Sequence, residues 1–111
     1  MKLQDQCIVL VRASGKKALA NQEEKCRAFG RVRGFKTSAV YPEREILPFQ
    51  RRRVLRWMVA YARAHEEVGF VLAYRARSIS RNNSELFLIR RLLKRYGLEL
   101  VFVKDTPEVR F

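Results

Sequence analysis

The chain has 111 residues, 48% of them hydrophobic and 32% charged, which is typical of one folded domain and excludes a disordered chain. The 24 Lys and Arg outnumber the 11 Asp and Glu, so the formal charge is +13. Such a charge favours a polyanionic partner, with nucleic acid first and an anionic membrane surface second, although it also fits a merely solubilising surface. Seventeen of the cations are arginine, whose planar fork suits bidentate contact with phosphate.

Cys7 and Cys26 lack the close spacing of a zinc site or a redox motif, so we expect two buried thiols in a reducing compartment. The longest apolar runs, such as residues 7–11, are far too short to span a bilayer, and the first residues contain no signal-peptide core. We therefore expect a cytoplasmic protein without a membrane span.

Apolar runs that alternate with amphipathic stretches predict four strands and three helices. A loop with two prolines is expected over 42–49, and Asn82 or Ser84 can cap the last helix, which Gly97 ends. The predicted strands are residues 7–11, 37–41, 69–74 and 98–103, and the predicted helices are about 19–29, 52–64 and 85–96.

Strands that alternate with helices imply right-handed crossovers. The fold class is therefore predicted to be α/β, with a mostly parallel sheet of about four strands and helices on both faces, in one domain over residues 1–111. In such sheets the functional residues lie on loops beyond the carboxyl ends of the strands. The two candidate loops are the one after the first strand, with Arg12 and Ser14, and the one over residues 75–81.

Ser14 stands two residues after Arg12 and just before Lys16 and Lys17. A serine hydroxyl needs a base or a strong positive field to act as a nucleophile, and cations also stabilise a phosphate under attack. This setting favours phosphoryl transfer over acyl transfer, although an Arg-x-Ser sequence is also ordinary turn chemistry. The only histidine, His65, is expected at the surface and gives a Ser-His-Asp arrangement little support.

Four motifs occur in order along nearly the whole chain. Residues 9–14, Val-Leu-Val-Arg-Ala-Ser, resemble an opening strand that ends Tyr-x-Arg-x-Ser, and residues 19–22, Leu-Ala-Asn-Gln, resemble a Ser-Leu-x-x-Gln element. Residues 52–55 resemble an Arg-Pro-x-Leu stretch, with Arg51 as the other candidate for its arginine, and residues 70–82 resemble a strand and loop that end Asp-Arg-Leu-Ser-Arg-Asn. This set of motifs resembles the catalytic domain of serine site-specific DNA recombinases, the resolvase/invertase family.

The resemblance implies that Ser14 attacks a DNA phosphate and forms a phosphoserine link to a DNA end. It implies that Arg12, Arg52 and Arg81 bind and polarise that phosphate and that Gln22 helps to position the site. Breaks in duplex DNA would then be exchanged between paired sites by a homodimer or tetramer of the full-length protein, with neither a metal nor another cofactor. Resolution, inversion, integration and transposition by a mobile element all stay open.

The signature loop departs from the family pattern, because Arg77-Ser78 stands where the family has Asp-Arg. Arg75, Arg77 and Arg51 are the candidates for a substitute phosphate contact, although a shift of one residue along a strand would turn a guanidinium to the opposite face. Leu10 also stands where the family has tyrosine. These departures favour, as an alternative, a catalytically degenerate domain that serves as a DNA-binding or protein-interaction module.

The chain ends soon after its last predicted strand, where the family continues into a dimerisation helix and a DNA-binding domain. We expect either a domain cut from a longer protein or a reduced homologue. A third hypothesis, an unrelated basic domain of the nucleotide-binding or receiver type, lacks the glycine-rich phosphate loop or the carboxylate cluster that it would need.

Overall fold

The computed structural model of the chain describes residues 4–44 and 51–104. Within these ranges the strands form one parallel sheet in the order β2-β1-β3-β4. This architecture confirms the predicted fold class. The strands are β1 (Gln6–Ala13), β2 (Lys36–Arg44), β3 (Val68–Ala73) and β4 (Glu99–Phe102), and the helices are α1 (Lys16–Val32), α2 (Arg51–Ala64), α3 (Ala76–Ile79) and α4 (Asn83–Arg95).

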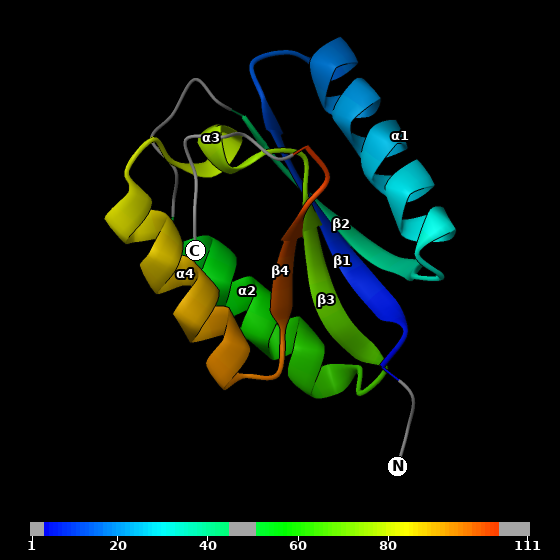
Figure 1. Cartoon of the computed structure of the whole chain (residues 1–111), viewed down its shortest axis with the longest axis vertical. Coiled ribbons are helices and arrows are strands. Elements are labelled where there is room, and N and C mark those ends of the chain that lie inside the picture. The colour runs from blue at the N-terminus through cyan, green and yellow to red at the C-terminus, as the bar shows by residue number, and fades with distance from the viewer. Residues whose placement is uncertain (1–3, 45–50, 105–111) are drawn as a thin grey trace.

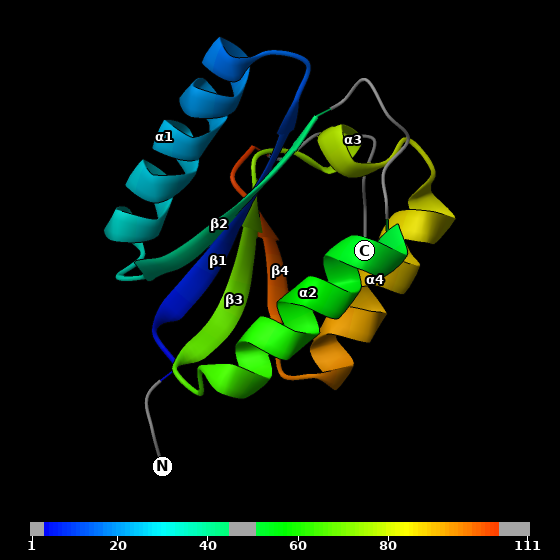
Figure 2. The same cartoon turned by 180° about the vertical axis from the view of Figure 1, so that it is seen from behind.

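The sheet lies between two layers of helix, with α1 on one face and α2, α3 and α4 on the other (Figures 1 and 2). Alternate side chains of a strand point to opposite faces of its sheet. Accordingly, Cys7, Val9 and Val11 of β1 pack under α1, whereas Ile8 and Leu10 pack against the three other helices. Burial on both faces explains why β1 is apolar from Cys7 to Val11.

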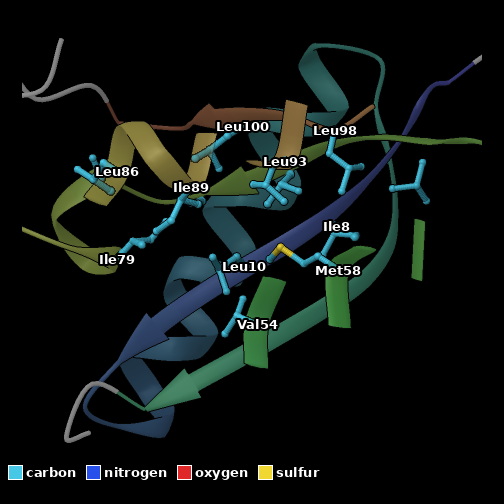
Figure 3. Close-up of a cluster of buried hydrophobic side chains, with 14 residues drawn as sticks. Ile8, Leu10, Val54, Met58, Ile79, Leu86, Ile89, Leu93, Leu98 and Leu100 are labelled. Carbon is cyan, nitrogen blue, oxygen red and sulfur yellow. The ribbon is translucent and has the colours of Figure 1, made fainter. Parts of the chain in front are cut away.

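The larger hydrophobic cluster fills the space between the sheet and α2, α3 and α4 (Figure 3). Val54 and Met58 of α2 lie against Ile8 and Leu10 of β1 in this cluster. Helix α4 contributes an apolar stripe of three buried residues at helical spacing. These residues are Leu86, Ile89 and Leu93.

A row of aromatic rings lies along the side of α2 that faces β2, and within it Tyr61 of α2 stacks on Trp57 and on His65. The ring centroids of Tyr41 and Trp57 are 5.0 Å apart, those of Trp57 and Tyr61 are 5.2 Å apart, and those of Tyr61 and His65 are 4.0 Å apart. The Tyr61 hydroxyl is 2.6 Å from the Ser38 hydroxyl. A partly buried phenol is stabilised by such a partner, so this bond holds α2 against β2.

Two predicted boundaries are wrong for identifiable reasons. Helix α1 begins at Lys16 rather than near residue 19, because Gly15 serves as its N-cap. Strand β2 continues through Pro42 to Arg44, where the sequence predicted a loop. Proline is tolerated there because β2 pairs only with β1 in the described sheet, and half of the N–H groups of an edge strand point away from the sheet. Residues 45–49 of the predicted loop lie outside the described residues.

The stretch after β3 was predicted as a loop over residues 75–81, but it contains the short helix α3. Ala76 and Ile79 are one turn apart and are both buried in the larger cluster, so the helix is held by its apolar side. The predicted cap of α4 is confirmed, because the Asn82 side chain accepts a hydrogen bond from the Glu85 N–H at 3.1 Å. Gly97 ends this helix with φ at +80°, a conformation that favours glycine.

The two cysteines provide a test of the core. Cys7 and Cys26 have no exposed surface, and burial raises the pKa of both thiols, that of Cys26 to about 12. Because the thiolate is the reactive form, we expect neither thiol to react with a disulfide reagent at about pH 8 in the native protein. Both should react at once in concentrated guanidinium chloride, which serves as the control. Rapid reaction of the native protein would contradict the buried placement.

Candidate active site

Ser14 lies in the short connection between β1 and α1, and its side chain is exposed. The next residue, Gly15, caps α1, and its carbonyl accepts a hydrogen bond from the Leu19 N–H at 3.0 Å. The first turn of α1 contains Lys16 and Lys17 and no acidic residue. The helix N-terminus and these two lysines together create a positive field around Ser14, and such a field favours a phosphate.

Gln22 ties α1 to the end of β1. Its Oε1 accepts a hydrogen bond from the backbone N–H of Arg12 at 3.1 Å. This bond is partly buried and joins residues that are ten positions apart in the chain. Arg12 lies two residues before Ser14, so the bond restrains the backbone that leads to the serine. The structure thus brings Gln22 to the backbone of Arg12, and this bond holds the end of β1 against the helix that follows Ser14.

The side chain of Arg12 lies on the face of the sheet opposite to α1. Because side chains alternate along β1, Arg12 shares the face of Ile8 and Leu10, on the side of α2 and α3. Its register partner on β2 is Glu43, which is only 6% exposed. Register partners in neighbouring strands share a face, so Glu43 places a carboxylate on the same side as Arg12.

Glu43 was not among the residues predicted from the sequence, because a loop was expected over residues 42–49. The signal was nevertheless present, because Tyr41 and Glu43 continue the alternation of β2 and both face the larger cluster. The described structure therefore has an acidic residue at this edge of the sheet, although it comes from β2 instead of from the loop after β3.

The two candidate substitutes after β3 lie on different sides of the sheet. Arg75 is extended, and its Cζ lies 5.0 Å from the centroid of the Tyr74 ring, which packs on the α1 side. Arg77 is exposed on α3, which packs against β1 on the side that Arg12 shares. The sequence predicts that a shift of one residue along a strand would turn the Arg77 guanidinium to the opposite face. That expectation does not apply, because residues 76–79 are helical.

Arg52 and Arg81 are also exposed and stand at the same edge of the sheet as Ser14. Helix α2 leads to the start of β3 and α4 leads to the start of β4, so both helices begin near the carboxyl ends of the strands (Figure 1). Arg52 lies in the first turn of α2 and Arg81 lies just before α4. The side chain of Arg51 lies outside the described residues.

His65 lies at the other edge, near the start of β3. It is exposed, as predicted, and its Nδ1 is 2.9 Å from the Tyr61 carbonyl oxygen. It is therefore remote from Ser14. Among residues 4–44 and 51–104, no group of three or more His, Cys, Asp or Glu is arranged to hold a metal ion, and no helix is long and apolar enough to cross a membrane.

The fold and the exposed residues at its carboxyl edge define a parallel α/β domain with a serine and several arginines on one edge. The family model described as the resolvase N-terminal domain matches residues 7–110, so the chain belongs to the resolvase family. Its function therefore lies in site-specific DNA recombination.

The fold is similar to that of a solved crystal structure, the C-terminal catalytic domain of ISC1926 TnpA, an IS607-like serine recombinase. The TM-score is 0.72 and the identity is 19%, over 93% of this chain and 73% of that chain. No curated protein matches the chain.

The bond between Arg12 and Gln22 can be tested by substitution. Gln22→Ala leaves a partly buried N–H without its side-chain acceptor, so we expect a loss of about 1 kcal/mol in the free energy of unfolding, measured by urea denaturation. Asn21→Ala, on the neighbouring exposed position of α1, is the control and should change stability by less than about 0.5 kcal/mol. Equal effects of the two substitutions would contradict a stabilising role for the bond.

Proposed function

We propose that this domain cleaves and rejoins duplex DNA in site-specific recombination, with Ser14 as the nucleophile. The observation that supports this proposal best is the position of Ser14, which is exposed at the positive end of α1 and follows a strand end held by Gln22. The family to which the chain belongs supports the reaction class. A phosphodiester is the substrate that such a field would stabilise during attack.

The reaction is a transesterification. The Ser14 Oγ forms a bond to phosphorus while the bond from phosphorus to a deoxyribose oxygen breaks. The serine proton passes to a base or to water, and the departing oxygen takes up a proton. The reverse step, with the hydroxyl of another DNA end as the nucleophile, releases Ser14. One phosphoester bond replaces another at each step, so the chemistry consumes neither ATP nor another cofactor.

The arginines at the carboxyl edge would bind the phosphate and stabilise its charge. Arg12 at the end of β1, Arg52 in the first turn of α2 and Arg81 just before α4 would have this role. Arg77 takes the place of the family's arginine at Ser78, because it lies on α3 on the side that Arg12 shares. Glu43 would hold the guanidinium of Arg12 in place from the neighbouring strand.

Strand exchange sets a requirement on assembly. Breaks in two duplexes comprise four cut strands, and each protomer supplies a single Ser14. The full-length protein would therefore act as a tetramer, formed from homodimers on paired DNA sites. Resolution, inversion and integration use the same four cuts and differ in the arrangement of the sites.

The alternative is a catalytically silent domain that binds DNA or another protein. The specific observation in its favour is the signature loop, where Ser78 replaces an arginine and Arg75 turns toward Tyr74. DNA binding without cleavage would then be its remaining activity.

A covalent adduct decides between the two. The protein is incubated with supercoiled plasmid that carries its candidate sites, and protein–DNA adducts that survive denaturation are measured. We expect an adduct that Ser14→Ala abolishes and that Ser84→Ala, at an exposed serine of α4, leaves unchanged. DNA binding without any adduct in the wild-type protein would contradict the catalytic proposal and favour the silent domain.

The same assay tests Arg77. Removal of one preorganised donor to a transition-state phosphate costs about two to three orders of magnitude in rate, so Arg77→Ala should slow adduct formation by about that factor. Arg91→Ala, an exposed arginine of α4 that lies over the Phe87 ring, should keep the wild-type rate. An unchanged rate in Arg77→Ala would show that this residue does not replace the missing arginine.

A further inference from the structure

Tyr74 follows β3 directly, and cations from three separate elements gather around it. The Lys25 Nζ on α1 donates a hydrogen bond to the Tyr74 Oη at 3.5 Å and lies 5.4 Å from the ring centroid. The Arg75 Cζ lies 5.0 Å from the same centroid. Lys104, just after β4, donates its backbone N–H to the Tyr74 carbonyl at 2.8 Å. We call these four residues the Tyr74 cluster.

Within residues 4–44 and 51–104, no carboxylate forms an ion pair with any of the three cations of the Tyr74 cluster. Burial raises the pKa of Tyr74, but hydrogen bonds from Arg75 and Lys25 and the charges of Lys25 and Lys104 outweigh this effect and lower it. The site thus favours negative charge, and Lys25 and Lys104 are exposed to receive it from outside.

The Tyr74 cluster adjoins the candidate active site. Lys25 lies three residues after Gln22, about one turn along the same side of α1, and Gln22 holds the N–H of Arg12. Tyr74 packs on the α1 side next to the carboxyl end of β1, whereas the side chain of Arg12 lies on the other side. An extended polyanion that crosses this edge of the sheet would meet both groups of cations.

We propose that the Tyr74 cluster is a second phosphate-binding site, which holds a backbone phosphate of duplex DNA beside the phosphate that Ser14 attacks. The Tyr74 hydroxyl donates a hydrogen bond to the phosphate, and the three cations neutralise its charge. The inference rests on the proposed function for its ligand, duplex DNA. In this proposal Arg75 binds a phosphate beside the one that Ser14 attacks, whereas Arg77 binds the attacked phosphate itself.

The salt dependence of DNA binding tests this inference. Binding of a fluorescent duplex of mixed sequence is measured by anisotropy over a series of salt concentrations. The slope of log K against log salt is negative, and each lost phosphate contact reduces its magnitude by about 0.9. Lys25→Gln and Arg75→Gln should each reduce this magnitude by about that amount, and the double variant by no more than one contact, because both residues hold the same phosphate. Tyr74→Phe should weaken binding with little change in slope, because it removes a hydrogen bond and no charge.

Arg63 and Tyr96 supply a matched control on the other side of the sheet. The Arg63 Cζ lies 5.6 Å from the centroid of the Tyr96 ring, and both residues are exposed. Arg63→Gln and Tyr96→Phe remove the same groups as Arg75→Gln and Tyr74→Phe but should leave both affinity and slope near the wild-type values. If Arg63→Gln reduces the magnitude of the slope as much as Arg75→Gln does, the effect is one of net charge and the inference is wrong.

The covalent assay separates failure of this inference from failure of the proposed function. A slope of smaller magnitude in the cluster variants supports the second phosphate site even if the wild-type protein forms no Ser14 adduct. A wild-type slope in those variants overturns the site even if the adduct forms. Absence of duplex binding by the wild-type protein at low salt would overturn both. Thermal denaturation of each variant confirms that the altered chains are folded.

Discussion

Burial of β1 on both faces is the constraint on which the rest of the structure depends. Residues 7–11 lie in the middle of the sheet and divide their side chains between two clusters, under α1 on one side and under α2, α3 and α4 on the other. Strands buried on both faces are typical of parallel sheets with a helix layer on each face, and β1 has a parallel neighbour on each side. The carboxyl end of β1, with Arg12 and then Ser14, is consequently delivered to one edge in a set orientation.

The cations at that edge form two groups, one on each side of the sheet. Arg12 and its register partner Glu43 belong to the side of α2 and α3, together with Arg77 on α3. Tyr74 and Arg75 belong to the α1 side. A carboxyl edge with positive charge on both sides of the sheet suits a ligand longer than one phosphate, as a DNA strand is.

The signature loop shows how a departure from a family pattern can be accommodated. Residues 76–79 form a helical turn whose apolar side, Ala76 and Ile79, is buried. Arg77 lies between them in the chain and is exposed. A carboxylate is likewise present at this edge, but it comes from β2 as Glu43. The predicted roles of Ser14, Arg12, Arg52, Arg81 and Gln22 stay predictions until the adduct assay is done.

The sequence by itself determined the fold class, the order of the four strands and of helices α1, α2 and α4, and the edge of the sheet that carries the candidate residues, because hydrophobic periodicity and glycine and asparagine signals act locally along the chain. It did not determine that β2 extends to Glu43, that residues 76–79 are helical or that Lys25 meets Tyr74. Each of these depends on contacts between residues far apart in the chain: a parallel edge pairing, burial against β1 and the packing of α1 across β3. Only the tertiary structure brings such residues together, because the spacing of residues within one segment carries no information about contacts with a distant segment.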